Sequence, residues 1–286
     1  MNKKVRIARL SIASNTLLII MKFVVGLISG SVSILSEAIH SAMDLVAAII
    51  AYFSVRVSDN PPDERHPYGH GKFENVSGVI EALLIIIAAG WIVFEAISKM
   101  SGEEPVESIG LGSLVMFISA GVNFIVSRRL YKVARETDSV ALEADALHLK
   151  TDVFTSLGVG IGLLLIWITK IHILDPIIAL LVAVIILKEA WELLSKAFSP
   201  LLDSSWKKEE VEELEKQLKM LGVHYHDLKT RKSGSYVFVE FHLEMPSEIT
   251  LSKVHLYCDE IEEELKKKIN NLRITIHAEP TFGENN

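Results

Sequence analysis

The hydrophobic and polar positions divide the chain into two parts. Up to about Pro200, long apolar runs are separated by short polar segments. The run 108–127 contains no charged residue, and the run 153–169 is similarly apolar. A helix needs roughly 20 such residues to cross the hydrocarbon core of a bilayer. The pattern predicts six transmembrane helices, over residues of about 8–29, 33–57, 75–98, 108–131, 140–169 and 174–198.

The remaining residues, 203–286, have the pattern of a small cytoplasmic domain. The segments WKKEEVEELEKQLKML and LSKVHLYCDEIEEELKKKI have helical periodicity. The segment VHYHDLKTRKSGSYVFVEFHLEM is typical of two strands around a Ser-Gly turn, and LRITIHAEP of a third strand. The order αββαβ predicts a small open-faced α+β sandwich that follows a membrane domain of residues 1–202.

Composition supports this division and excludes two classes of protein. Half of the residues are hydrophobic, and the mean hydropathy is +0.34. The net charge of −7 gives no basic footprint for a nucleic acid, because the acids cluster on the tail helices. The lone cysteine, Cys258, cannot form an internal disulfide. We therefore expect neither a nucleic-acid partner nor a secreted disulfide framework.

Basic residues flank the predicted spans asymmetrically. The N-terminus and the connections after the second and fourth spans are basic, whereas the opposite side carries Glu103, Glu104 and Glu107. The basic residues are Lys3, Lys4, Arg6, Arg9, Arg56, Arg65, Lys72, Arg128, Arg129, Lys132 and Arg135. By the positive-inside rule, both termini are predicted to lie in the cytoplasm.

Ionisable side chains recur inside two of the predicted spans. The second span contains His40 and Asp44, and the fifth repeats this H-x-x-x-D spacing with His148 and Asp152. Residues four apart share one face of a helix. Each face also carries an acid one turn earlier, namely Glu37 and Asp145. A charge at the bilayer centre costs about 2.5 kcal/mol or more, so such residues indicate function.

Two interpretations fit a pair of this kind. A single H-x-x-x-D pair is compatible with a polar clasp between helices, whereas two pairs in two spans favour a metal site or a proton path. Facing each other, the pairs offer two imidazole nitrogens and two carboxylates, a ligand set that suits tetrahedral zinc. The carboxylates would neutralise the cation, and the cation would offset the burial of the carboxylates.

A second group of possible ligands lies in the polar segment PPDERHPYGHGK. Asp63, His66 and His70 are three and then four residues apart, so they converge on one ion if the segment is partly helical. The alternative is a solvated loop shaped by its prolines and glycines.

These motifs together resemble the cation diffusion facilitator family across nearly the whole chain. The resemblance rests on GSVSILSEAIHSAMD, PPDERHPYGHGKFE, ADALHLKTD and LDP, in that order within six spans and a small tail. It implies a homodimeric antiporter, not an enzyme, that moves divalent metal out of the cytoplasm in exchange for protons. It also implies a metallochaperone-like, ferredoxin-like tail and a place among the lipids of a prokaryotic inner or plasma membrane.

The resemblance assigns the metal ligands of the spans and the loop. His40, Asp44, His148 and Asp152 fall on the family's transport-site positions. Histidine at position 40, where many bacterial relatives have Asp, resembles the zinc-preferring type, and His148 argues against manganese. Zn²⁺ is therefore the expected substrate, with Fe²⁺, Co²⁺ and Cd²⁺ as competitors. Asp63, His66 and His70 fall on a cytoplasmic-loop site of that family.

The resemblance also places functional residues in the tail. A binuclear site at the dimer interface is implied at His226, His242, His255, His277 and Glu279. Many relatives have Asp at the position of Glu279. Lys72 and Asp203 match a charge interlock between the second cytoplasmic loop and the start of the tail. His224 has no family counterpart, and Cys258 is either a soft ligand or a small core residue.

The ligand chemistry predicts coupling between metal and protons. Metal needs neutral imidazole and ionised carboxylate, so binding expels protons and protonation expels metal. His40 or His148 is the expected proton carrier. Two other functions remain as alternatives: a membrane-anchored metal sensor, and a haem protein with His40 and His148 as axial ligands.

Overall fold

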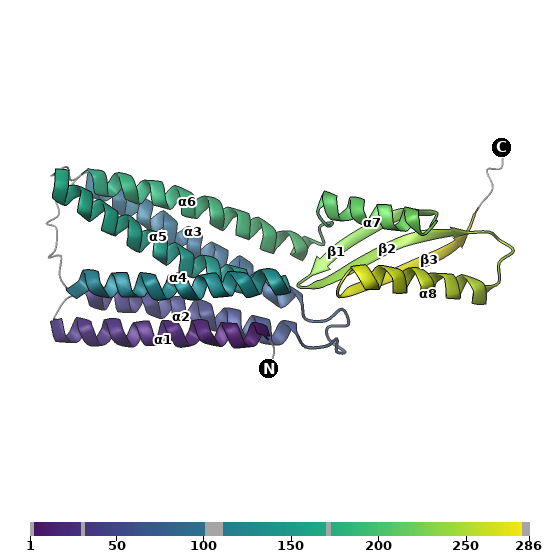
Figure 1. Ribbon diagram of the computed structural model, residues 1–286, viewed down its shortest axis with the longest axis horizontal. Coiled ribbons are helices and arrows are strands. Elements are labelled where there is room, and N and C mark those ends of the chain that lie inside the picture. The colour runs from purple at the N-terminus through teal and green to yellow at the C-terminus, as the bar shows by residue number, and fades with distance from the viewer. Residues whose placement is uncertain (1–2, 30–31, 101–110, 170–172, 282–286) are drawn as a thin grey trace. The chain divides into compact units, whose positions relative to one another are not determined.

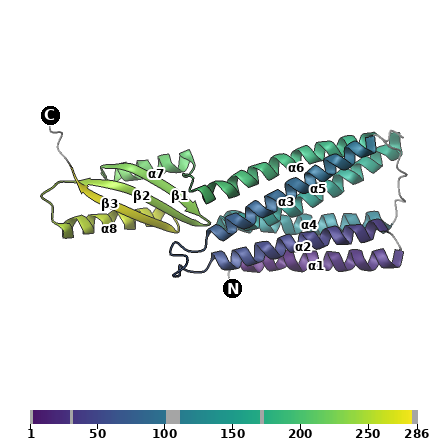
Figure 2. The ribbon, with the colours of Figure 1, turned by 180° about the vertical axis from the view of Figure 1, so that it is seen from behind.

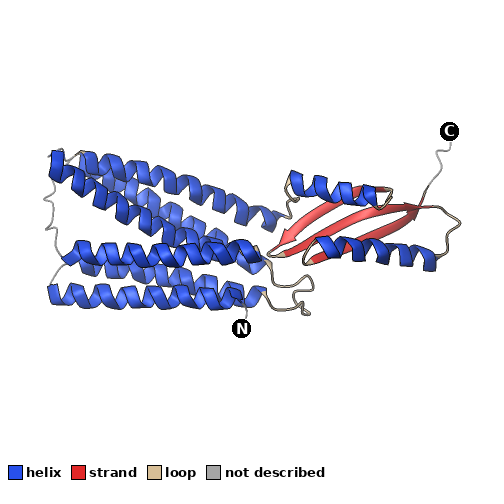
Figure 3. Cartoon of the chain, in the orientation of Figure 1, coloured by secondary structure: helices blue, strands red, loops and turns tan. Residues whose placement is uncertain are grey.

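A computed structural model describes residues 3–29, 32–100, 111–169 and 173–281 of the chain. The chain forms two compact units, Met1–Phe198 and Ser199–Asn286. The first contains long helices, and the second contains all three described strands (Figure 3).

The first unit contains the six described helices α1 to α6, which lie side by side as a bundle (Figures 1 and 2). Each has 25 to 30 residues, which at about 1.5 Å per residue exceeds the thickness of a hydrocarbon core. In the bundle, α1 packs on α2 and α4, α4 packs on α5, and α3 packs on α5 and α6. The helices are α1 Lys3–Ser29, α2 Val32–Ser58, α3 Lys72–Met100, α4 Leu111–Thr137, α5 Val140–Thr169 and α6 Leu174–Phe198.

Small side chains fill the interior of the bundle, and many large apolar side chains face outward. Alanines without exposed surface include Ala47, Ala48, Ala51, Ala82, Ala89, Ala144, Ala146 and Ala190. The exposed side chains include Leu17, Ile28, Ile87, Trp91, Phe94 and Trp191. Small residues allow helix backbones to approach closely in a membrane, and an apolar exterior suits contact with lipid.

Two of the described helices, over Lys3–Ile28 and Lys72–Ser98, are long and apolar enough to cross a membrane by length and composition. Each of the six helices overlaps a stretch expected from the sequence, but α1 begins at Lys3, before the predicted start near residue 8, and α4 continues to Thr137, beyond the predicted end near residue 131. Charged residues such as Asp44, Lys150 and Asp152 lower the apolarity of α2 and α5.

A buried ionic network ties one end of the bundle together. Glu74 is 1% exposed, and its Oε1 lies 2.9 Å from Nζ of Lys4. Ser58 donates a hydrogen bond to the same oxygen at 2.8 Å, and Ser139 donates one to Oε2. The ammonium of Lys4 also lies 3.3 Å from Asp59. One carboxylate therefore links α1, α2, α3 and the segment that precedes α5.

The second unit is a three-stranded sheet with two helices on one face. The strand order is β1-β2-β3, with β1 antiparallel and β3 parallel to β2. The inward positions of β2, such as Phe241 and Leu243, pack with Leu218 of α7 and Leu265 of α8. Side chains alternate along a strand, so His242 and Glu244 lie on the other face, which α7 and α8 do not cover. The elements are the 3-10 helix η1 Ser199–Leu202, α7 Lys208–Met220, β1 Tyr225–Ser233, β2 Tyr236–Met245, α8 Leu251–Lys268 and β3 Leu272–Pro280.

Candidate metal sites

The helical unit brings Asp44 of α2 together with His148 and Asp152 of α5. Nε2 of His148 lies 3.0 Å from Oδ1 of Asp44. One potential ligand atom from each residue lies within 4.8 Å of the others. Asp44 is buried, and the other two are half-buried. The fourth expected ligand, His40, belongs to α2, but its side chain lies outside the described residues.

Neighbouring helices hold this group with side-chain amides. Asn123 of α4 donates a hydrogen bond to Oδ2 of Asp152 at 3.4 Å. Asn15 of α1 donates one to the backbone oxygen of Asp44 at 3.5 Å. Asn123 is the only Asn or Gln in the charge-free run 108–127 of the sequence. This isolated amide is the one feature of the sequence that could have drawn attention to its contact with Asp152. Groups of this kind orient metal ligands.

Two further acids are buried in the same unit. Asp145 and Glu81 are 1% and 0% exposed. Ser11 donates a hydrogen bond to Oδ1 of Asp145 at 3.1 Å, and Ser77 donates one to Oε1 of Glu81 at 3.1 Å. Within the described part of the chain, the second oxygen of each carboxyl group has no hydrogen-bond partner. The sequence spacing predicts Asp145 on the same helix face as His148, one turn earlier.

The connection between α2 and α3 brings Asp63, His66 and His70 together. Oδ1 of Asp63 lies 3.3 Å from Nδ1 of His66, and Oδ2 lies 3.3 Å from Nε2 of His70. The segment is a series of turns and bends, as in the loop alternative, rather than a partial helix, and Gly69 takes a φ of 88°. The backbone N–H groups of Arg65 and His66 donate to Asp63, and the latter bond holds the pKa of Asp63 below its usual range.

The tail brings His226, His242 and Glu279 together on the uncovered face of the sheet. Oε1 of Glu279 lies 3.1 Å from Nε2 of His226, and Oε2 lies 3.3 Å from Nδ1 of His242. His277 is next to this group, with its ring centroid 4.7 Å from that of His242. His255 lies apart from it on α8, is 75% exposed and pairs with Asp259 at 3.6 Å.

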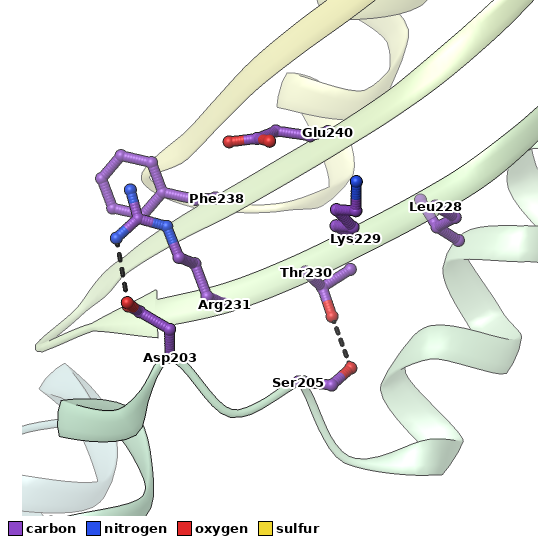
Figure 4. A pocket seen from close by; sticks show the side chains of 8 residues that line it. All are labelled: Asp203, Ser205, Leu228, Lys229, Thr230, Arg231, Phe238 and Glu240. Carbon is purple, nitrogen blue, oxygen red and sulfur yellow. Dashed lines mark hydrogen bonds and ion pairs between the residues drawn. The ribbon is translucent and has the colours of Figure 1, made fainter.

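Asp203, Lys72 and Cys258, which the sequence analysis also named, lie outside the three groups of possible metal ligands. Asp203 accepts a hydrogen bond from Nη1 of Arg231 at 3.2 Å, beside a surface hollow that also contains Glu240 (Figure 4). Lys72 is the first residue of α3. Cys258 is half-buried against the core of the tail, and burial raises the pKa of its thiol. These surroundings are those of a core residue rather than a reactive thiol.

Comparison with known proteins places both units in one family. Residues 8–202 match the cation efflux transmembrane domain, and residues 206–281 match the cytoplasmic domain of cation efflux proteins. A transporter of Synechocystis sp. is 33% identical over 88% of this chain and 83% of its own length. The cation-efflux pump FieF of Yersinia enterocolitica is 32% identical over 93% of this chain and 89% of its own.

A solved structure also matches part of this chain in sequence. It belongs to a putative zinc transporter, CzrB, in its zinc form, and is 36% identical over 29% of this chain and 98% of that chain. Its TM-score is 0.26.

The match of residues 8–202 to the cation efflux transmembrane domain makes the chain an integral membrane protein of the cation-efflux class. The chain belongs to the cation diffusion facilitator family of cation efflux proteins. This finding confirms the resemblance seen in the sequence motifs.

Proposed function

We propose that the protein exports divalent metal from the cytoplasm, with zinc as the preferred ion, in exchange for protons. The observation that carries this proposal is the meeting of Asp44 with His148 and Asp152 across two helices of the bundle. Imidazole and carboxylate ligands suit zinc, although Fe²⁺, Co²⁺ and Cd²⁺ also accept such a set. His40, one turn before Asp44 on α2, would complete four ligands.

Proton exchange follows from the chemistry of these ligands. Nε2 of His148 faces Oδ1 of Asp44 at 3.0 Å, a geometry in which one proton fills the space between them. A zinc ion between the same two atoms needs that nitrogen free of its proton. Metal and proton therefore compete for the same site between His148 and Asp44. If this site opens alternately to the two sides of the membrane, the protein exchanges metal for protons.

The proposed arrangement has all six helices crossing the membrane and both termini in the cytoplasm. The N-terminus and the connections after α2 and α4 are rich in basic residues. This distribution supports the proposed orientation in a prokaryotic inner or plasma membrane. The protein would act as a homodimer whose tails bind zinc through His226, His242 and Glu279. His277 and the exposed His255 would join that site when a second tail approaches. Asp63, His66 and His70 would form a separate loop site.

A charge interlock is also part of the proposal. Lys72 at the start of α3 would pair with Asp203 at the start of the tail. Asp203 takes a φ of 54° and shares its carboxylate with Arg231, so the carboxylate is held at the surface of the tail.

The test uses purified protein in liposomes with a zinc dye and a pH dye inside. An imposed zinc gradient should drive zinc across the membrane and protons the opposite way, and Asp44→Asn should abolish both fluxes. Asp138→Asn is the matched control, because asparagine tolerates the left-handed backbone found at that position (φ 49°). Zinc binding without flux in the native chain would contradict export and favour a metal sensor. A Soret absorbance band in the purified protein would favour the haem alternative.

A further inference from the structure

The uncovered face of the tail sheet carries two rows of ionisable side chains. The strand register sets His226, His242 and His277 opposite one another across β1, β2 and β3. Two residues further along, Glu244 of β2 pairs with Glu279 of β3. Because side chains alternate along each strand, both rows point to the face that α7 and α8 leave open.

The carboxylate of Glu279 lies between a ring nitrogen of His226 and a ring nitrogen of His242. Its two oxygens lie 3.1 Å from Nε2 of His226 and 3.3 Å from Nδ1 of His242. Two ligands of a tetrahedral zinc ion with bonds of about 2.0–2.1 Å are about 3.4 Å apart. Each histidine therefore lies at about this spacing from one oxygen of Glu279, and one potential ligand atom of each of the three residues lies within 4.8 Å of the others.

The outer nitrogen of His226 has a partner of its own. Nδ1 of His226 lies 3.1 Å from Oε1 of Glu244. A histidine that binds metal through one ring nitrogen carries a proton on the other, and a carboxylate that accepts this proton fixes both the tautomer and the ring orientation. Glu244 is outside the three-residue ligand group, yet it is placed to do this for His226.

We propose that Glu244 is the positioning residue of the tail metal site, and that it holds His226 in the tautomer whose Nε2 is free to bind zinc. This inference rests on the proposed tail site. The side chains of His226 and Glu244 are 47% and 39% exposed, so their hydrogen bond contributes little to folding. Its effect belongs to metal affinity, where loss of such a partner typically lowers binding about 10–100-fold.

Asp227 has a weaker role toward the second histidine. Its Oδ2 lies 3.7 Å from Nε2 of His242, which is beyond hydrogen-bond distance. Lys229 donates a hydrogen bond to the same carboxylate at 2.6 Å and holds the pKa of Asp227 below its usual range. An irregularity in strand pairing between His226 and Lys229 places Asp227 here with a φ of 51°. Asp227 therefore acts on His242 by charge alone, and the effect of its removal is smaller than that of Glu244.

The experiment measures zinc binding to the purified full-length protein, with His242→Ala used to identify the ions held by the tail. Glu244→Gln should lower the zinc affinity of the tail site about 10-fold or more. The zinc affinity of the other sites and the thermal stability of the protein should stay unchanged. Glu240→Gln is the matched control: it removes the same charge from the same face of β2, two residues before His242, and should have no effect. Asp227→Asn should lie between the two.

A second readout separates positioning from a general effect of charge. In protein with ¹⁵N-labelled histidine, the ring-nitrogen shifts of His226 should report a protonated Nδ1 in the native chain and a mixture of tautomers in Glu244→Gln. Unchanged zinc affinity and unchanged shifts in Glu244→Gln would overturn the inference. If His242→Ala itself loses no zinc, the proposed tail site is wrong, which is a different outcome from failure of Glu244 alone.

Discussion

Nε2 of His148 lies 3.0 Å from Oδ1 of Asp44, although the two residues are 104 positions apart in the chain. This contact joins α5 to α2 and brings Asp44 of one H-x-x-x-D motif together with His148 and Asp152 of the other. The same contact pairs two ionisable groups inside an apolar bundle, so that each offsets part of the cost of burying the other.

Removal of one anionic ligand should weaken the site in the bundle more than any change nearby. Asp44→Asn keeps the shape of the side chain but removes its charge. We expect the zinc affinity of this site to fall by more than about 10-fold, since the ion loses a charged ligand inside a low-dielectric interior. Calorimetric titration of the purified protein measures this loss. An Asp44→Asn protein with native affinity at every site would exclude Asp44 as a ligand.

Gly78 and Gly90 of α3 should respond differently to substitution by alanine, because only Gly78 is closely packed against other helices. A Cβ at Gly78 would lie 2.8 Å from Cγ1 of Val140 and 3.0 Å from Cβ of Ala197, whereas a Cβ at Gly90 meets nothing within 4 Å. Gly78→Ala should therefore destabilise the bundle by about 1–3 kcal/mol. Gly90→Ala should not destabilise it, because alanine is the better helix former. Thermal unfolding in detergent compares the two, and equal effects would contradict the packing described.

The buried network around Glu74 predicts a large loss of stability. Glu74→Gln leaves the ammonium of Lys4 with a weaker set of partners in a buried position, which typically costs about 3–5 kcal/mol. Glu136→Gln removes an acid of the same type that pairs with Lys3 at the surface, and it should leave stability nearly unchanged. The unfolding midpoints of the two variants measure the contrast. Similar midpoints would show that Glu74 is not buried as described.

The loop site predicts a specific response to pH. The pKa of Asp63 is lowered in the folded chain by the backbone N–H of His66, so its contribution to the loop is complete above the usual carboxyl pKa of about 4. The contribution is lost as the pH falls through the lowered value. Fluorescence of Tyr68, within the loop, should therefore show a transition below pH of about 4 in the metal-free protein. Asp63→Asn should remove this transition, and a transition that persists in the variant has another origin.

The local elements could be predicted from the sequence, whereas most long-range partners could not. The sequence predicts a hairpin, because apolar residues alternate through Val237, Val239 and Phe241 after a Ser-Gly turn. The structure has this hairpin, and Gly234 takes the positive φ of 57° that the turn requires. Spacing alone also predicts which residues of α2 and α5 share a face. Neither pattern predicts that the two faces meet, because that depends on packing across the bundle.

Residues that act through a partner were the ones missed. Asn123 is a single amide in an apolar run, and only the position of α4 beside α5 brings it to Asp152. Glu244 resembles any other acid of an acidic tail, and only the strand register sets it beside His226. Spacing along the loop suggested that Asp63, His66 and His70 could meet, and turns rather than a helix bring Asp63 to His70.

The most direct test of the account separates transport from regulation by comparing two variants in zinc-loaded liposomes. Asp152→Ala removes a ligand from the bundle, and His242→Ala removes one from the tail. We predict that Asp152→Ala abolishes zinc flux and the opposite proton flux while it still binds zinc in the tail, and that His242→Ala retains coupled flux. Native zinc flux in Asp152→Ala would contradict the central claim that this group of residues carries the transported ion.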